Sequence, residues 1–208
     1  MLIAFAQTGE YDYTGHFLQS VKGHELWHIT DEETPGLPGC EVFRLPKNEP
    51  FMFWRAKAYA AFNRPGLYID TDIIVNRDPS PVMALDFDVA LTKHWVPIRD
   101  PSGVNLTELM PYNGGVVFVK NADFWPHVVE LMGQMQPEHK EWYGDQLALA
   151  HLAKQYYTVE LPAKLYNYTP KVKEHETGAD LSDKWILHYK GNRKEWMKDY
   201  VTRHLREP

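Results

Sequence analysis

Short apolar runs with the character of β-strands alternate along this chain with segments of helical character. Strand-like runs occupy 2–6, 67–75 and 185–189, and an alanine-rich segment at 51–62 has the composition of a helix that ends before Pro65. This alternation is typical of α/β proteins, in which helices connect and cover the strands. We therefore predict an α/β fold in which a mainly parallel central sheet is flanked by helices. The same criteria predict further strands at 25–30, 89–92 and 114–119, and helices within 9–23 and 144–156.

Length and composition indicate one domain that neither binds nucleic acid nor spans a membrane. With 208 residues, 44% of them hydrophobic, the chain can bury one sizeable core, so we expect a single domain over 1–208. The net charge of −6 argues against binding to nucleic acid, which needs many cationic contacts to phosphate. No stretch of about 18 apolar residues is present to span a membrane, and the N-terminus lacks the basic start of a signal peptide. Cys40 is the single cysteine, which excludes an internal disulfide, so we expect a cytoplasmic protein.

The segment "HELWH" at 24–28 matches the zinc-protease pattern His-Glu-x-x-His. That pattern binds zinc only on a helix, where both histidines lie on one face. Gly23 precedes the segment, a loop rich in proline and glycine begins at Thr34, and the residues between favour a strand. We therefore predict a strand with surface histidines and no zinc-protease chemistry.

The stronger metal signal is "YIDTDIIV", which contains Asp70 and Asp72. Alternate side chains of an extended segment share a face, so the two carboxylates are expected to project together at the end of a buried strand. Two carboxylates at the carboxyl end of a strand suit Mg²⁺ or Mn²⁺, which keeps water ligands and bridges to substrate phosphates. The alternative is structural, with Asp70 capping a neighbouring element and Asp72 beginning a turn.

Three further motifs combine polar residues with glycines or with the start of a helix. In "HYKGNRKEW", His188 could complete a metal site, while Gly191 and Lys194 could accommodate a diphosphate; an ordinary polar loop is the alternative. In "MPYNGGVVFV", Asn113 and two glycines precede a strand, where they could meet a sugar hydroxyl or simply form a turn. In "YGDQLALA", Asp145 and Gln146 stand at a helix start, where Asp145 could serve as an N-cap instead.

Together these residues resemble the retaining glycosyltransferases of family 8, a group with the GT-A nucleotide-sugar fold that includes bacterial galactosyltransferases and glycogenin. The resemblance extends over residues 2–197 and rests on short motifs in the family's order. It implies a GT-A (Rossmann-like) nucleotide-diphospho-sugar transferase fold and a hexose transfer that retains the configuration of the donor sugar. The matching residues are Tyr11, Arg55, Asp70-Thr71-Asp72, Asn113-Gly114-Gly115, Asp145-Gln146 and His188-x-x-Gly191-x-x-Lys194-x-Trp196.

The resemblance also implies a role for each matching residue. Asp70, Asp72 and His188 would bind Mn²⁺ or Mg²⁺, and the donor would be a nucleotide-diphosphate sugar, above all a UDP-sugar. The metal and Lys194 would stabilise the negative charge that develops on the leaving diphosphate. The acceptor would be a saccharide or another hydroxyl compound. The remaining roles are diphosphate binding by Gly191 and Lys194, donor-sugar binding by Arg55, Asn113 and Asp145, substrate binding by Gly114, base stacking by Tyr11, and a place beside the anomeric carbon for Gln146. Gln146 and Asp145 are the candidate catalytic residues.

The chain departs from the family's pattern in three respects. Thr8 and Gly9 stand where the family has an acid that contacts the uracil, so the nucleotide base stays open, with Thr8 as the remaining candidate contact. The family's Lys-Pro-Trp is Lys194-Glu195-Trp196 here. The chain is also short for the family, which leaves the acceptor undefined.

Two other classes of protein stay open from the sequence alone. A nucleotidyltransferase would also place paired aspartates on an α/β sheet, but the segment "AQTGEYDYTGH" lacks the basic residues that a triphosphate-binding loop requires. A non-catalytic nucleotide-sugar binding module would keep the pocket and turn over nothing.

Overall fold

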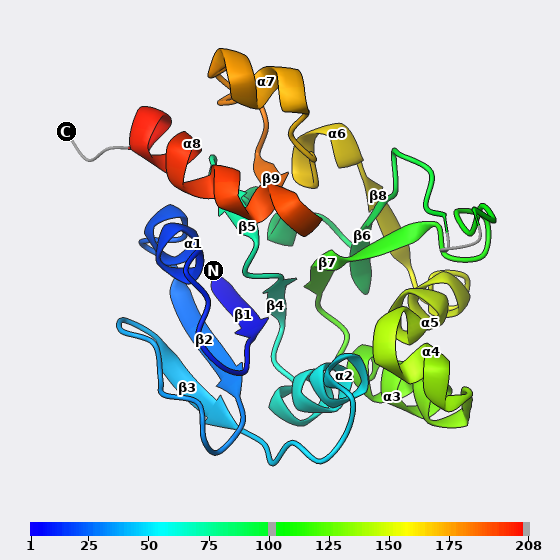
Figure 1. The fold of residues 1–208 in the computed structure, drawn as a ribbon. Helices are drawn as coiled ribbons and strands as arrows, with labels where there is room; N and C mark the ends of the chain where they lie inside the picture. Colours follow the sequence, from blue (N-terminus) through cyan, green and yellow to red (C-terminus); the bar gives the residue numbers. More distant parts are fainter. Residues whose placement is uncertain (100–102, 206–208) are drawn as a thin grey trace.

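The computed structural model describes residues 1–99 and 103–205 and places seven strands in one central sheet (Figure 1). All neighbouring strands are parallel except where β7 pairs, because β7 runs antiparallel to both β4 and β6. The sheet is therefore mixed but mainly parallel, as predicted. In spatial order its strands are β3 (Glu41–Arg44), β2 (Glu25–Thr30), β1 (Leu2–Ala6), β4 (Gly66–Ile69), β7 (Tyr112–Val119), β6 (Val89–Lys93) and β8 (Thr158–Leu161).

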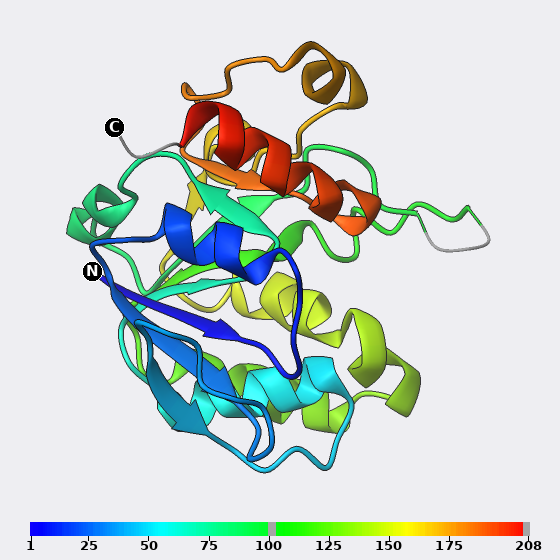
Figure 2. The same ribbon diagram turned by 60° about the vertical axis from the view of Figure 1, so that its left-hand side comes forward.

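Helices cover both faces of the sheet and give the molecule three layers (Figure 2). One face is covered by α2 (Phe51–Phe62), α3 (Phe124–Gln134) and α5 (Gly144–Leu152). The other face is covered by α1 (Thr14–Ser20), α8 (Trp196–His204) and a two-stranded sheet of β5 (Ile73–Val75) and β9 (Ile186–His188). Shorter elements complete the connections: η1 (Ser80–Ala84), α4 (Pro137–Trp142), α6 (Ala163–Tyr166), α7 (Val172–Thr177) and η2 (Gly191–Glu195).

Alternation along β1 explains how one strand serves two cores. Ile3 and Phe5 pack in the core beneath α1 and α8, whereas Leu2 and Ala4 pack in the core beneath α2 and α3. Successive side chains of a strand point to opposite faces, so an apolar residue at every position is what a strand buried on both faces requires. Each fully buried Phe or Ile contributes about 1.5–3 kcal/mol to folding.

Several strand ends meet at one edge of the sheet because of its topology. The carboxyl ends of β1, β4 and β6 lie at this edge, and the antiparallel β7 begins there. In open α/β sheets, ligands bind outside the carboxyl ends of the strands, where the strand order reverses direction. Here β1 begins the chain with β2 on one side and β4 on the other, so the edge meets that condition.

Most predicted elements are confirmed, with small differences at their ends. The strand at 2–6 and the helix at 51–62 have the predicted bounds. The predicted helix within 9–23 ends earlier, at Ser20, and the helix from Gly144 ends at Leu152 rather than at 156. Among the described residues, every helix falls short of the length and apolar character that crossing a membrane requires.

The prediction of one strand over 67–75 is wrong. The chain leaves the central sheet after Ile69, bends through 70–72 and enters the small sheet at Ile73. Asp70 and Asp72 therefore lie in the bend between two strands and not on one face of a single strand. Three polar residues at 70–72 cannot continue a strand that is buried on both faces, because an unpaired buried carboxylate is too costly.

The segment "HELWH" forms the approach and the first part of β2, so the strand prediction is confirmed. The expectation of surface histidines is wrong for His28, which is fully buried, stacks on Phe5 and has its Nε2 3.2 Å from the carbonyl oxygen of Gln7. Burial lowers the pKa of His28. Glu25 points outward and pairs with Arg64 at 2.9 Å, so its carboxylate is turned away from the buried His28 ring.

Candidate active site

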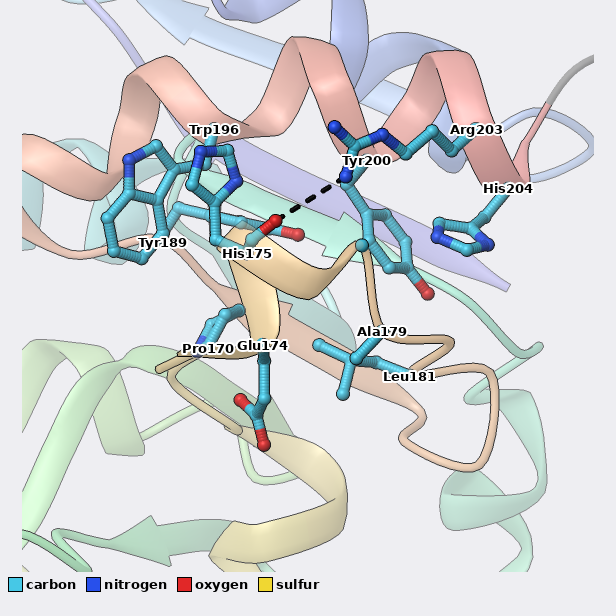
Figure 3. A pocket seen from close by; sticks show the side chains of 11 residues that line it. Pro170, Glu174, His175, Ala179, Leu181, Tyr189, Trp196, Tyr200, Arg203 and His204 are labelled. Carbon is cyan, nitrogen blue, oxygen red and sulfur yellow. Dashed lines mark hydrogen bonds between the residues drawn. The ribbon is translucent and has the colours of Figure 1, made fainter. Parts of the chain in front are cut away.

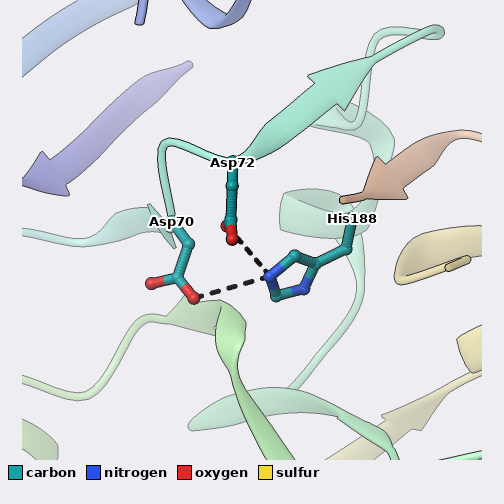
Figure 4. Close-up of side chains that lie close together, drawn as sticks. All are labelled: Asp70, Asp72 and His188. Carbon is teal, nitrogen blue, oxygen red and sulfur yellow. Dashed lines mark ion pairs between the residues drawn. The ribbon is translucent and has the colours of Figure 1, made fainter. Parts of the chain in front are cut away.

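Asp70, Asp72 and His188 converge on one point at the carboxyl edge of the sheet (Figure 4). One ligand atom from each residue lies within 4.8 Å of the others. The Nε2 atom of His188 is 3.0 Å from Asp72 Oδ1 and 3.7 Å from Asp70 Oδ2. Two carboxylates and an imidazole form a donor set that fits a divalent metal ion.

Backbone pairing brings these three side chains together. The amide of Asp70 donates to the carbonyl of Gly115 at 3.0 Å, which extends the β4–β7 pairing by one residue. In the small sheet, Ile73 lies opposite His188, and the amide of Tyr189 donates to the carbonyl of Asp72 at 2.8 Å. The bend at 70–72 therefore joins the two sheets, and its carboxylates face the end of β9.

Lys194 lies beside the same carboxylates, with its Nζ 3.4 Å from Asp72 Oδ2. Burial alone would raise the pKa of Asp72, but the fields of His188 and Lys194 together lower it. Burial likewise opposes the charge of Lys194, while Asp72 and Tyr13 raise its pKa above the ordinary value. The site thus holds positive and negative charges at contact distance, at a surface open to a ligand.

Arg55 joins two carboxylates from different parts of the chain. Its Nη1 donates to Asp70 Oδ1 at 2.6 Å and its Nη2 donates to Asp145 Oδ2 at 2.5 Å. Asp70 and Asp145 raise the pKa of Arg55 above its ordinary value against the effect of burial. Burial raises the pKa of Asp145, and contact with Arg55 works against that rise. Helices α2 and α5 are thereby tied to the bend at 70–72 through one guanidinium.

Gly114 and Gly115 lie inside β7, as the predicted strand at 114–119 has them, but β7 begins at Tyr112, so the "NGG" motif belongs to the strand and does not form a turn before it. A Cβ at 115 would be 2.4 Å from His188 Cε1 and 2.6 Å from Asp70 Oδ2. A Cβ at 114 would be 2.7 Å from Asp145 Oδ2. Both glycines are therefore required by the neighbouring side chains of the site, which occupy the space where a Cβ would stand.

A cavity of about 300 Å³ opens above these groups and collects most of the predicted residues. His188 lies behind the two aspartates rather than in the lining, and Gly191 lines an adjoining hollow together with Tyr11 and Lys194. Thr8 lies in neither lining and accepts from Lys47 Nζ at 3.4 Å. The predicted residues that line the cavity are Tyr11, Arg55, Asp70, Asp72, Asn113, Gly114, Asp145, Gln146 and Lys194.

His94 is a residue of the site that the sequence did not indicate. It follows β6, and its Nε2 is 2.8 Å from Gln146 Oε1 and 3.1 Å from the carbonyl oxygen of Tyr112. Because the Tyr112 carbonyl can only accept, His94 Nε2 carries the proton and donates to both oxygens. The Gln146 carbonyl is thus turned to His94 and its NH₂ group is left for the cavity. Burial first, and then the charge of Lys190, lowers the pKa of His94 to about 4.

Asn167 is the second residue that the sequence analysis missed. It follows α6, is 1% exposed, and its side chain contacts Asn113, His188 and Thr92. No motif surrounds it in the sequence, and the residues that it contacts come from three other segments of the chain.

A second, smaller pocket lies between α7 and α8 (Figure 3), and its lining contains none of the three candidate metal ligands. His175 stacks on Trp196, with their ring centroids 4.5 Å apart, and Arg203 closes one side by donating to the carbonyl of His175 at 3.4 Å. Its volume of about 20 Å³ is room for one water molecule and far too small for a nucleotide.

The fold resembles that of the glycosyltransferase GlyE from Streptococcus pneumoniae TIGR4, with a TM-score of 0.59 at 17% sequence identity. The similarity covers 100% of this chain and 64% of that chain, so the present chain spans less than two thirds of GlyE. A nucleoside-diphosphate-sugar pyrophosphorylase from Vibrio cholerae RC9 is similar at a TM-score of 0.46, with 9% identity over 78% of this chain and 92% of that chain, which is too little to support an argument. No protein-family model and no curated protein sequence matches the chain. The fold is thus GT-A-like, with a mainly parallel central sheet flanked by helices, as predicted.

Proposed function

We propose that this protein is a metal-dependent glycosyltransferase of the family 8 kind, which moves a hexose from a nucleotide-diphosphate sugar to a hydroxyl acceptor. The observation that carries the proposal is the convergence of Asp70, Asp72 and His188 beside Lys194 at the rim of the cavity. A diphosphate needs a divalent cation and a further positive charge, and both fit at this one point.

The donor is proposed to lie along the carboxyl edge of the sheet. Its diphosphate would lie between the metal ligands, Lys194 and Gly191, and its sugar would lie toward Asn113, Asp145 and Gln146. Tyr11 is 46% exposed and stacks on Tyr13 with ring centroids 5.3 Å apart, which leaves one ring face for a nucleotide base. A UDP-sugar is the donor that we would test first, with Mn²⁺ or Mg²⁺ as the ion.

Retention of configuration is supported by the partners of the carboxylates that line the cavity. Asp70 and Asp72 belong to the metal group, and Asp145 is held by Arg55. None of these three carboxylates is free to act as the general base that inversion requires. The described residues that line the cavity include no other carboxylate. We propose that the acceptor hydroxyl attacks on the face that the diphosphate leaves. The sugar–phosphate bond breaks, the new glycosidic bond forms, and the hydroxyl proton passes to the leaving phosphate oxygen.

The acceptor, the cytoplasmic location and the single domain over 1–208 stay predictions. GlyE extends well beyond the length that this chain matches. We propose a saccharide or another hydroxyl compound as the acceptor, and no nucleic acid partner.

A thermal-shift panel of nucleotide-sugars, each with and without Mn²⁺, tests the proposal. A ligand that binds only the folded state adds about 2.7 kcal/mol to the free energy of unfolding when its concentration is a hundredfold above Kd, and this raises the melting temperature. We expect a donor-specific rise that needs the ion and that disappears in Asp72→Asn. The control is Asp86→Asn, an exposed carboxylate outside both linings. Equal shifts with and without Mn²⁺ would contradict the metal-dependent site.

Slow donor hydrolysis measured with Mn²⁺ or Mg²⁺ and again with EDTA tests catalysis itself. We expect hydrolysis of the sugar–phosphate bond that stops in EDTA, and NMR of the anomeric proton of a transfer product should show retention. Binding without turnover would indicate a binding module, and release of pyrophosphate from a nucleoside triphosphate would indicate a nucleotidyltransferase.

A further inference from the structure

Asn167 is held against His188 by the backbone pairing of the next residue, Tyr168, with β9. The amide of Tyr168 donates to the carbonyl of Ile186 at 3.0 Å, and the amide of His188 donates to the carbonyl of Tyr168 at 2.7 Å. The segment after α6 therefore runs beside β9 as a short parallel bridge between Tyr168 and Leu187. This pairing fixes the side chain of Asn167 beside the imidazole ring with little freedom to move.

The direction of the side-chain hydrogen bonds follows from one backbone amide. The N–H of Gly115 is 3.1 Å from Asn113 Oδ1, and a backbone N–H can only donate, so that atom of Asn113 is the carbonyl oxygen. The same oxygen is 2.8 Å from the Asn167 amide, which must therefore present its NH₂ group. The second hydrogen of that group points to Thr92 Oγ1 at 2.7 Å.

The Asn167 carbonyl oxygen is left to face His188, at 2.9 Å from the ring's Nδ1. An oxygen acceptor at that distance requires a hydrogen on Nδ1. The other nitrogen, Nε2, faces Asp72 Oδ1 at 3.0 Å and Asp70 Oδ2 at 3.7 Å, so an ion held by these two carboxylates would meet the lone pair of Nε2 while the hydrogen stays on Nδ1. A chain of hydrogen bonds that begins at Gly115 thus sets which nitrogen of His188 can bind a metal.

We propose that Asn167 is a positioning residue of the metal site, which holds His188 in the tautomer and orientation that present Nε2 to the ion. The inference rests on the proposed function, because that function requires an ion at this site. Metal-binding histidines depend on the partner of their second nitrogen, and losing such a partner costs roughly 10- to 100-fold in metal affinity or activity. Here that partner is also tied to Asn113 in the cavity lining, so one amide connects the metal group to the proposed sugar site.

Three variants separate positioning from a merely structural role. Asn167→Ala removes the acceptor for His188 together with both donor bonds. Asn167→Asp keeps an acceptor for His188 but loses the donors to Asn113 and Thr92. Thr92→Val is the matched control, because Thr92 is also fully buried and bonds to the same amide, yet it does not touch His188.

Mn²⁺ titration followed by electron paramagnetic resonance gives the affinity of each folded variant. We expect Asn167→Ala to bind Mn²⁺ about 10- to 100-fold more weakly, with Asn167→Asp and Thr92→Val within about threefold of the parent protein. Wild-type affinity in folded Asn167→Ala would overturn the inference, as would an equal loss in Thr92→Val. If Asn167→Ala fails to fold, a loss in Asn167→Asp as large as that of His188→Ala would overturn it instead.

Histidine-selective ¹⁵N NMR with Mg²⁺, a diamagnetic ion, reports the proton directly. We expect the parent protein to show a hydrogen on His188 Nδ1 and none on Nε2; the opposite assignment would overturn the inference. Neither measurement needs a sugar donor. The expected Nδ1 proton and affinity losses without any sugar transfer would therefore refute the proposed function and leave the role of Asn167 standing.

Discussion

Replacing Arg55 by methionine should be among the most damaging single changes to the folded state. The Arg55 side chain is 9% exposed and contacts two carboxylates, of which Asp145 is 5% exposed and Asp70 27% exposed. Removing one partner of a buried ion pair costs about 3–5 kcal/mol, because the other charge is left buried without compensation. For a chain of this size, about 2–4 °C of melting temperature per kcal/mol gives a fall of about 6–20 °C.

Two further variants make this prediction specific to the buried charge. Arg55→Met combined with Asp145→Asn removes both charges of the buried pair and should recover a large part of the loss. Lys57→Met changes a lysine on the same helix whose pair with Glu49 is 42% and 32% exposed at the two side chains. Exposed pairs contribute about 0–1 kcal/mol, so this control should stay close to the parent protein.

Urea unfolding followed by tryptophan fluorescence at pH 8 and at pH 5 measures the effect. Burial raises the pKa of Asp145, and without Arg55 only the hydrogen bond from the backbone amide of Gln146 still opposes that rise. A carboxyl with a raised pKa in the folded state binds protons more readily there than in the unfolded chain, so stability increases as the pH falls. The deficit of Arg55→Met should therefore be smaller at pH 5. A loss below about 1 kcal/mol at pH 8, or no recovery in the double variant, would refute the reasoning.

Three other predictions follow from the described contacts. Burial lowers the pKa of His94 from 6.5 to about 4, so as the pH falls the unfolded chain takes up this proton before the folded protein does, and stability should decrease from about pH 6.5 to about pH 4. Urea unfolding of His94→Gln should show that loss of stability reduced by on the order of 2 kcal/mol, and an unchanged pH profile would contradict the prediction. Gly115→Ala should weaken Mn²⁺ binding because its Cβ meets the metal ligands, whereas Gly133→Ala, with nothing within 4 Å, should raise the melting temperature by stabilising α3 by about 0.4–1 kcal/mol. Glu25→Ala should leave donor turnover within a few-fold of the parent while His188→Ala nearly abolishes it, and peptidase activity with added zinc that depends on Glu25 would reverse the assignment.

The sequence predicted best those parts of the structure that depend on local periodicity. The helix at 51–62 is rich in alanine and is followed by Pro65, and both signals act within one turn of chain. The segment "ELWHIT" was correctly predicted as a strand despite its match to a zinc-protease motif, because Gly23 before it and the loop after it are incompatible with a helix. The candidate metal group was indicated by the spacing of Asp70 and Asp72 and by the motif that contains His188, and the family resemblance supported it. The structure brings its three members together although the predicted strand at 67–75 is broken.

The contacts that the sequence could not give are those between distant segments. Asn167 acquires its place from backbone pairing with 186–188, and nothing in its neighbourhood distinguishes it from an ordinary polar loop residue. His94 reaches Gln146 because the end of β6, the start of β7 and the first turn of α5 lie at the same edge of the sheet. The burial of His28 depends in the same way on its neighbour in β1, against which its ring stacks. Residue type and spacing do not specify which face of a strand will be covered.

The pairing of Ile73 with His188 has a consequence for how the protein is made. These residues lie far apart in the sequence, and contacts of this kind close late in folding because a long loop must first be ordered. During synthesis, the chain can form β1, β2 and α2 long before the histidine leaves the ribosome. A nascent chain therefore carries Asp70 and Asp72 before His188 is available, so an ion held by this group would be bound tightly only once the C-terminal segment has docked. Since binding free energy then adds to folding free energy, the metal would lock the last part of the chain in place.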